Sequence, residues 1–191
     1  MDALFGIFSA FGLSASAGLN AYIPLLVVGV IAHYTNWIKL SQPYDLLANP
    51  WILILVSVLL IIEMLADKVP AVNHINDIIQ TVFRPAAGAI VFAASAHAVT
   101  GVNPLLALAC GLLVAGSVHT VKAVAVRPAI TATTAGAGNV PVSIAEDVIA
   151  TVLSILSIII PILVGVFLVI FVALIIWWFW RRAARRHQTV S

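Results

Sequence analysis

The sequence predicts an all-α integral membrane protein with about six transmembrane segments, and three observations lead to this fold class. The chain of 191 residues is 63% hydrophobic and only 8% charged, with a mean hydropathy of +1.16. Soluble domains are about a quarter charged, so this composition excludes a water-soluble core. Long apolar runs alternate with short polar connections, and a helix needs about 20 apolar residues to cross a bilayer.

We expect one polytopic domain over residues 1–180 and a basic cytoplasmic tail over residues 181–191. The four arginines of this tail are Arg181, Arg182, Arg185 and Arg186. Because the tail follows directly on an apolar run, it is typical of a contact with anionic lipid. It lacks interleaved aromatic residues and therefore does not indicate nucleic-acid binding. The single cysteine, Cys110, excludes an intrachain disulfide and a multi-cysteine metal site.

The first predicted span, residues 3–33, has a middle rich in glycine, serine and alanine around Asn20 and Pro24. Small residues let helices pack closely in lipid, which is one interpretation. The other is a discontinuous helix whose freed backbone groups line a cavity. The residues alone leave both open.

The second span, residues 51–66, follows a connecting loop at residues 33–50 and ends in Glu63, Asp67 and Lys68. Glu63 comes a full turn before the apolar run ends, where a carboxylate costs on the order of a few kcal/mol or more. On a continuing helix Glu63 and Asp67 share one face, so they could bind a cation or share a proton. The alternative is an ion-pair cluster that only fixes the end of this span.

Residues 72–83 have apolar side chains at helical spacing and a polar opposite face, but they are too few to span a bilayer. They predict an amphipathic helix at the membrane interface or along a vestibule, which Arg84-Pro85 ends. Two further spans are expected at residues 86–99 and 105–121, with His119 and Lys122 at the end of the second.

Residues 127–141 are mostly small, hydroxyl and glycine residues, and we expect a short, broken fifth segment that contains Thr134 and Asn139. Ser143 and Glu146 then have the spacing of a capping box at the start of the next helix.

The last apolar segment, residues 147–180, would be about 50 Å long as a single helix. A bilayer core is about 30 Å thick, so we expect a tilted and kinked helix, a projecting helix or a hairpin.

Six crossings place the basic residues mostly on one side, with Lys39 alone on the other. The residues on the basic side are Lys68, Arg84, Lys122, Arg127 and the arginine tail. This agrees with the positive-inside rule and predicts that both termini are cytoplasmic. Five crossings, with residues 131–141 re-entrant, would send the tail outside.

Two pairs of similar segments in the sequence predict an internal repeat. The second span with its charged end and Arg84-Pro85 resembles the fourth span with its own basic end and Arg127-Pro128. Residues 14–24 resemble residues 131–141. Paired interrupted segments point to a midplane site in repeat-built transporters, although small-residue sequences also match by chance.

The candidate pathway residues are Glu63, Asp67, Lys68, Arg84, His119, Lys122, Arg127, Asn20, Asn139 and Thr134. Ionisable residues inside a membrane mark substrate or ion pathways, whereas snorkelling anchors and packing residues are the alternative. His97 has the same two interpretations, and His74 with Asp77 fits either metal binding or a solvated face. We find no enzyme motif and expect neither catalysis nor a cofactor; a bound metal stays open.

The chain resembles an uncharacterised bacterial membrane family called domain of unknown function 4126. The resemblance rests on Glu63-x-x-x-Asp67-Lys68-x-Pro70, on Arg84-Pro85-x-x-Gly88, and on residues 16–22. It implies a small multi-pass protein of the bacterial inner membrane and supplies no substrate. A weaker likeness is to cation/proton exchangers with the signature Glu-x-Gly-Asp-Lys-Thr, from which Glu63–Val69 departs by an extra residue and a missing glycine.

These observations favour a small transporter or channel for an ion or small solute, which a homo-oligomer would also suit. The first alternative is a membrane scaffold or lipid-binding protein that transports nothing. The second is a cation/proton exchanger.

Overall fold

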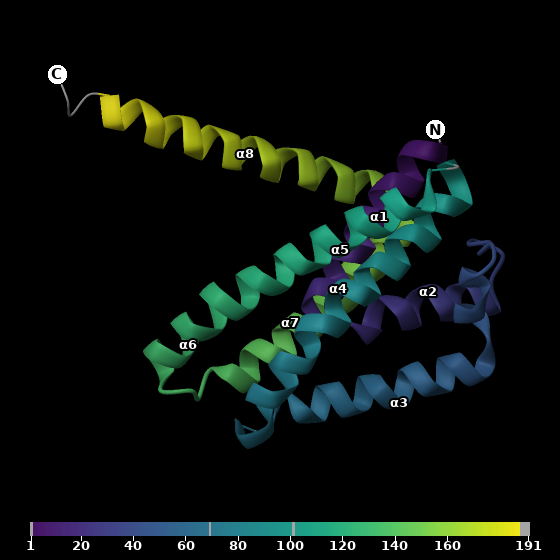
Figure 1. The fold of residues 1–191 in the computed structure, drawn as a ribbon, viewed down its shortest axis with the longest axis horizontal. Helices are drawn as coiled ribbons and strands as arrows, with labels where there is room; N and C mark the ends of the chain where they lie inside the picture. Colours follow the sequence, from purple (N-terminus) through teal and green to yellow (C-terminus); the bar gives the residue numbers. More distant parts are fainter. Residues whose placement is uncertain (1, 69, 101, 188–191) are drawn as a thin grey trace.

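The structure is a computed structural model that describes residues 2–68, 70–100 and 102–187, and all regular elements among them are helical (Figure 1). The helices are α1 (Asp2–Leu19), α2 (Tyr22–Tyr34), a 3₁₀ helix (Tyr44–Ala48), α3 (Pro50–Ala66), α4 (Pro70–Thr100), α5 (Pro104–Val121), a π-helix (Lys122–Val126), α6 (Arg127–Thr134), α7 (Asn139–Ile159) and α8 (Pro161–His187). The all-α fold class is therefore confirmed.

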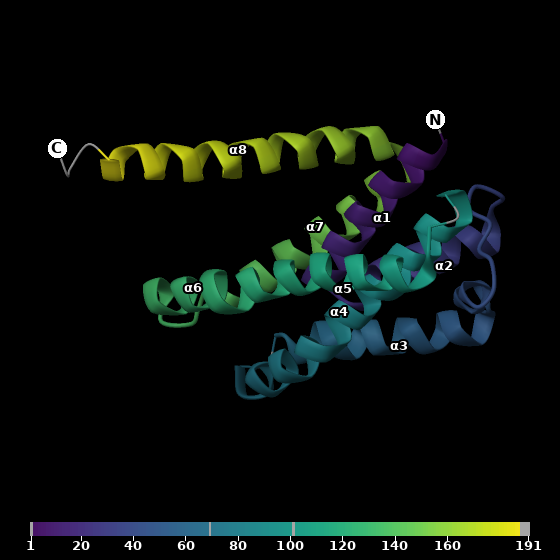
Figure 2. The ribbon, with the colours of Figure 1, turned by 45° about the horizontal axis from the view of Figure 1, so that its top comes forward.

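Helices α1 and α2 form a fold-back pair and not one continuous span (Figures 1 and 2). The break falls at Asn20, whose Oδ1 accepts hydrogen bonds from the backbone N–H groups of Tyr22 and Ile23 at 3.1 and 3.2 Å. Asn20 therefore satisfies two of the free donors in the first turn of α2. The discontinuous helix was one of two interpretations of residues 3–33, and it is the one observed.

Helix α4 runs through the Arg84-Pro85 pair that was expected to end a separate amphipathic helix. That prediction is wrong, and so is the independent span at residues 86–99. This part of α4 is amphipathic as predicted, but its apolar face points outward and its polar face points into the protein, as in a membrane protein. Ile78 and Val82 are exposed, whereas Gln80 and Arg84 are buried at 2% and 0% exposure.

Helix α5 continues through the π-helix into α6, so residues 127–134 extend the fourth predicted span. The chain then turns at residues 135–138, where Ala135 and Gly136 have positive φ angles of 52° and 88°. The prediction of a separate, broken fifth segment is therefore wrong. Residues 127–141 are the end of one helix, a turn and the start of α7.

The predicted last segment is two helices that meet at Ile160 and Pro161 (Figures 1 and 2). Ile160 has φ −134° and ψ 65°, outside the helical region, and the helix resumes at Pro161. Helix α8 runs back toward the end of the molecule where α6 lies. A single continuous helix over residues 147–180 is therefore excluded: the chain breaks at Ile160 and Pro161, and α8 leads away from α7 (Figures 1 and 2).

Three helical stretches of the described chain are long and apolar enough to cross a membrane, namely Ile78–Ala96, Pro104–Thr134 and Asn139–Ile159. Shorter apolar helices are Leu4–Leu19, Tyr22–Tyr34 and Pro50–Ala66. The molecule is thus a membrane protein, while the predicted count of six crossings is not confirmed. The start of α1 and the end of α8 lie at opposite ends of the molecule (Figure 1), and the predicted side of each terminus stays a prediction.

The predicted repeat is not confirmed either. The break after α3 separates Lys68 from Arg84 by more than three turns of α4, whereas Lys122 and Arg127 are joined by a continuous helix. In the second pair of similar segments, the first contains a buried break at Asn20 and the second an exposed turn at residues 135–138, so the two differ in structure.

Helices α1, α4 and α5 form the close-packed centre of the molecule. A Cβ atom on Gly88 would collide with Ala115 of α5, and one on Gly111 would collide with the Gly88 carbonyl oxygen. Ser14 Oγ donates to the Gly111 carbonyl at 2.7 Å, so α1 also packs closely against α5. Glycines at these positions bring the backbones together, as is common in lipid.

Candidate functional site

The end of α3 carries a buried acid that α4 neutralises. Glu63 is 1% exposed, and its Oε1 accepts hydrogen bonds from Arg84 Nη2 at 2.9 Å and Arg84 Nε at 3.3 Å. Arg84 is itself completely buried. A buried ion pair persists only with good geometry and further hydrogen bonds. The geometry of this pair is good and Arg84 has a further partner in His119, whereas Glu63 Oε2 has no donor among the described residues.

Asp67, one turn after Glu63, is the most heavily contacted carboxylate. Asn76 Nδ2 donates to its Oδ1 at 2.6 Å, and Ser143 Oγ donates to its Oδ2 at 3.0 Å. The same Oδ2 lies 3.3 Å from Arg127 Nη2 and 3.8 Å from Arg84 Nη2. Asp67 therefore joins α3 to both α4 and α6.

The pKa of Asp67, which lies just beyond the apolar stretch of α3, is set by these neighbours. Burial alone raises this pKa, but the charges of Lys122, Arg84 and Arg127 and the hydrogen bond from Asn76 outweigh burial. The pKa of Asp67 consequently lies below its ordinary value of 3.8, and the group is ionised at neutral pH.

The π-helix brings two bases to one acid of α7. Lys122 Nζ lies 2.7 Å from Glu146 Oε2, and Arg127 Nη2 lies 3.5 Å from the same oxygen. Residues five apart point in different directions on an α-helix, which turns about 100° per residue. In the π-helix the Arg127 N–H donates to the Lys122 carbonyl, so the two residues stack and both reach Glu146.

Lys68 and Asp147 tie the network to the break between α1 and α2. Lys68 Nζ lies 3.5 Å from Asp147 Oδ2, and Asn20 Nδ2 donates to Asp147 Oδ1 at 3.0 Å. On the other side of the break, Lys122 Nζ donates to the Leu19 carbonyl at 3.1 Å. A cation at a helix C-terminus is favourable, so the end of α1 is held by charge.

His119 extends the network to α4 through both ring nitrogens. Its Nδ1 lies 3.3 Å from Arg84 Nη1, and its Nε2 lies 3.1 Å from Thr81 Oγ1. Because a guanidinium can only donate, Nδ1 is the acceptor and the proton of the neutral ring belongs on Nε2. His119 therefore fixes the Arg84 side chain from the side opposite to Glu63.

Together these side chains form what we call the charged network, which comprises Glu63, Asp67, Lys68, Arg84, Lys122, Arg127, Glu146 and Asp147. It holds four acids and four bases, so its formal charge is zero. All are buried except Lys68, which is partly exposed. Charges inside an apolar bundle are costly unless they are paired. Ionisable residues in such a place therefore suggest a functional site.

The structure brings together eight of the ten predicted pathway residues, with Asn20 and His119 in direct contact with the network. Asn139 and Thr134 do not join it. Asn139 exchanges hydrogen bonds with Thr131, and Thr134 Oγ1 accepts from the Gly138 N–H at 2.9 Å. Thr134 thus stabilises the turn at residues 135–138.

Glu146 and Asp147 are the members that the sequence reasoning missed. The capping-box interpretation of Ser143 and Glu146 is wrong, because α7 begins at Asn139 and both side chains point to the network. The sequence signal that could have found them is the balance of acidic and basic residues. Without these two acids, the bases inside the apolar region outnumber the acids.

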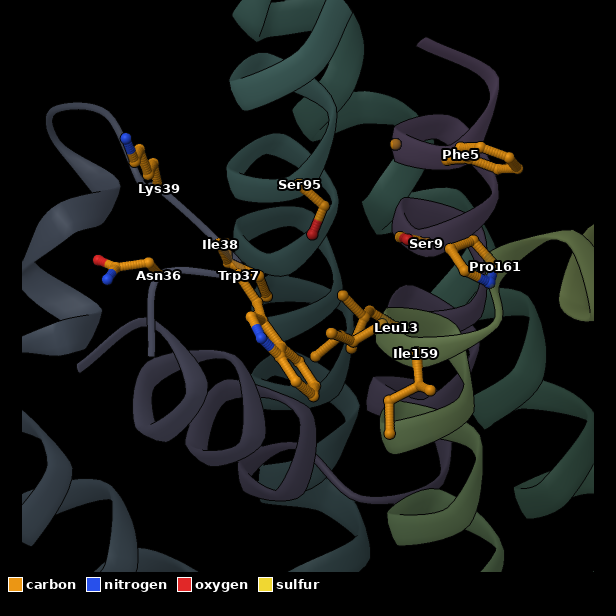
Figure 3. A pocket seen from close by; sticks show the side chains of 12 residues that line it. Phe5, Ser9, Leu13, Asn36, Trp37, Ile38, Lys39, Ser95, Ile159 and Pro161 are labelled. Carbon is orange, nitrogen blue, oxygen red and sulfur yellow. The ribbon is translucent and has the colours of Figure 1, made fainter. Parts of the chain in front are cut away.

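Two cavities lie on opposite sides of the network. One, of about 400 Å³, is lined by Asp67, Lys68, Asn139 and the turn at residues 135–138. The other, of about 720 Å³, lies near the start of α1, where Trp37, Leu13 and Ile159 project toward one another (Figure 3). Ser9 and Ser95 add hydroxyl groups to its wall (Figure 3).

Several other predictions lie outside the described side chains, namely those on His74, Asp77, His97, Arg182, Arg185 and Arg186. Arg181 is described, and its guanidinium lies 4.9 Å from the centre of the Trp177 ring. Within the described part of the chain, no group of three or more His, Cys, Asp or Glu side chains is placed to hold a metal ion.

Comparison with known families agrees with the resemblance noted in the sequence. Residues 7–181 match the family described as Domain of unknown function (DUF4126). The chain belongs to this family. The DUF4126 match covers every element from α1 into α8, including the whole charged network. No curated protein and no solved structure matches significantly, and the likeness to cation/proton exchangers stays a prediction.

Proposed function

We propose that this protein is a small membrane transporter or channel for an ion or small solute. The observation that carries the proposal is the buried break between α1 and α2, which Lys122 and Asp147 of the charged network hold on its two sides. Interrupted helices whose ends meet ionisable groups inside the membrane are typical of transport sites.

The arrangement of the ion pairs supports movement along this path. Asp67 lies between Arg84 and Arg127, and Arg127 lies between Asp67 and Glu146. Two of these contacts, at 3.5 and 3.8 Å, are longer than a short charge-assisted hydrogen bond. A small shift of α6 or α7 would exchange partners without leaving a buried charge unpaired. Such two-state contacts allow a gate to open at low cost.

The cavities support the same proposal. The cavity at Asp67 and Lys68 gives access to the network from one end of the molecule. The cavity at Trp37 and Leu13 approaches α1 from the other end. We propose that the substrate passes between them beside Asn20, and that the two sides are the cytoplasm and the exterior of a bacterial inner membrane.

For the scaffold alternative, the question is which residues would contact lipid. Arg84 and Arg127 are 0% and 7% exposed, so neither can hold a lipid headgroup. A lipid-binding protein would therefore depend on the arginine tail, beginning at Arg181 beside Trp177. Contact of this tail with anionic lipid is compatible with transport as well.

Flux through purified protein in proteoliposomes tests the proposal. The assay would offer cations, anions and small metabolites in turn and record uptake by the wild type. We expect uptake of at least one class, and a fall of about tenfold or more in Asp147→Asn, which weakens the contacts at the break. Asp45→Asn is the matched control, because Asp45 is exposed on the 3₁₀ helix. No uptake of any class by correctly folded wild type would overturn the proposal.

A further inference from the structure

Three buried acceptor oxygens in or beside the charged network have no hydrogen-bond donor among the described residues, and one of them, Asp147 Oδ2, still faces Lys68 Nζ at 3.5 Å; the other two face no base. These two are Glu63 Oε2 and Gln80 Oε1, in side chains 1% and 2% exposed. Glu63 uses only Oε1 for both of its hydrogen bonds with Arg84. Buried acceptors in native proteins nearly always have a donor, so each one that lacks a partner calls for a ligand or a role.

The two oxygens belong to one small region where α2, α3 and α4 meet. Gln80 lies one helical turn before Arg84, the residue that binds Glu63. The Tyr22 side chain lies within electrostatic range of both Gln80 and Glu63. An added donor placed here would meet the free oxygen of an acid and the free oxygen of an amide.

The surrounding charges decide which donor fits. Arg84 of α4 contacts Glu63 directly, Lys122 of the π-helix lies nearby, and Asp67 follows one turn along α3. His119 of α5 contacts Arg84, and Tyr22 of α2 completes the surroundings. A metal cation would need several oxygen ligands and would meet the guanidinium of Arg84. A proton needs only one oxygen to bind and one to accept its hydrogen bond.

We propose that Glu63 is the proton-carrying residue of the network, with the proton bound on Oε2 and its hydrogen bond directed toward Gln80. The proton comes from water on one side and returns to water on the other, and only the O–H bond forms and breaks. Protonation changes the network from neutral to a charge of +1 and weakens the attraction between Glu63 and Arg84. Arg84 can then strengthen its contact with Asp67, now 3.8 Å away.

This inference deepens the proposed function, because it makes the proton the coupled or transported ion at the same network. Its use in transport rests on that function, whereas the binding of the proton does not. Infrared difference spectroscopy on the full-length protein in detergent detects it directly, since a protonated carboxyl group has a C=O band that an ionised one lacks.

Other acids of the chain also gain a carboxyl band in acid, so we expect one component of the wild-type band to be missing in Glu63→Gln. Glu146→Gln is the matched control, since Glu146 is a buried acid whose Oε2 is paired with Lys122 at 2.7 Å; this variant should keep that component. Gln80→Leu leaves the Glu63–Arg84 pair intact and guards against a folding defect. It should keep the component but bind the proton about tenfold more weakly, a midpoint about one pH unit lower. A band of full wild-type amplitude in folded Glu63→Gln, or an unchanged midpoint in Gln80→Leu, would overturn the inference.

Proteoliposome flux separates the two proposals. A Glu63-dependent band in a wild type that transports nothing would overturn the transport function and support the proton site. Flux that keeps its full pH dependence in Glu63→Gln would overturn the proton site and support transport.

Discussion

Arg84 contacts two acids of the charged network, Glu63 and Asp67, and also His119 beside the network. We expect Arg84→Met to destabilise the protein by about 3–5 kcal/mol, because it leaves Glu63 buried and charged without its partner. Thermal unfolding in detergent measures this, with Lys39→Met, an exposed base, as the control. The double variant Glu63→Leu, Arg84→Met should recover most of the loss. A cost under about 0.5 kcal/mol for Arg84→Met would contradict the assigned role.

Asp67 makes the stability of the protein depend on pH in a defined direction. Its pKa is lower in the folded protein than the ordinary value of 3.8. Its charge therefore contributes stability that is fully present above that value and is lost as the pH falls through the folded pKa. The difference in unfolding temperature between wild type and Asp67→Asn should shrink as the pH is lowered from neutral toward about 3. Asp45→Asn should show no such trend, and a gap that widens with acid would contradict the prediction.

At the residue scale the sequence indicated which residues gather in the charged network better than it indicated how they pair. Glu63, Asp67 and the bases were identifiable because charge in an apolar run is costly wherever the helix lies. Glu146 and Asp147 were missed because acids near a helix start have an ordinary local explanation in capping. Their true partners, Lys122 and Lys68, are far away in the chain, and local patterns carry no information about them.

Among the elements, the π-helix is the one whose geometry the network depends on. Deleting Ala123 should convert its five-residue turn into an α-helical turn of four, in which Lys122 and the arginine still share a face. We expect this deletion to keep the unfolding temperature close to that of the wild type. Deleting Ala109 within α5 should instead rotate one part of the helix by about 100° and unfold the protein. Equal damage by the two deletions would contradict this view of the π-helix.

Two glycines of α5 provide a matched pair for the packing of the centre. Gly111→Ala should destabilise the protein, because its Cβ would collide with the backbone of α4. Gly116→Ala should be neutral or stabilising by up to about 1 kcal/mol, since the nearest atom to its Cβ is 3.8 Å away and alanine favours helix. Thermal unfolding of the two variants decides, and similar values would argue against backbone contact at Gly111.

The sequence predicted helices well and their boundaries poorly, for identifiable reasons. Pro85 normally ends a helix, yet here α4 continues, because packed neighbours in a membrane protein can compensate for the lost backbone hydrogen bond. The break at Asn20 could only be an alternative, since the contacts that hold it come from Asp147 and Lys122. The last segment is two helices with a break before Pro161, and its uniform apolar composition could leave this only as one of several alternatives.

The whole molecule has reversed polarity, with buried polar side chains and an apolar exterior. Its described ends lie at opposite ends of the longest axis, and the Lys68 turn lies toward the end where α8 finishes (Figure 1). With the positive-inside rule, we expect the N-terminus outside and the arginine tail in the cytoplasm. In a Cys110→Ala background, a membrane-impermeant thiol reagent should label Asp2→Cys in intact cells. Ser191→Cys should react only after permeabilisation, and the same behaviour at both positions would contradict this topology.

The order of synthesis gives the charged network a consequence for biogenesis. When residue 127 has left the ribosome, the chain already carries two of the network's acids and all four of its bases. Among the network residues the bases then exceed the acids by two, an excess that only α7 removes when Glu146 and Asp147 arrive. The helical bundle therefore cannot complete its assembly until its seventh helix enters the membrane. A chain released before that point would expose unpaired cations to the proteases that clear incomplete membrane proteins.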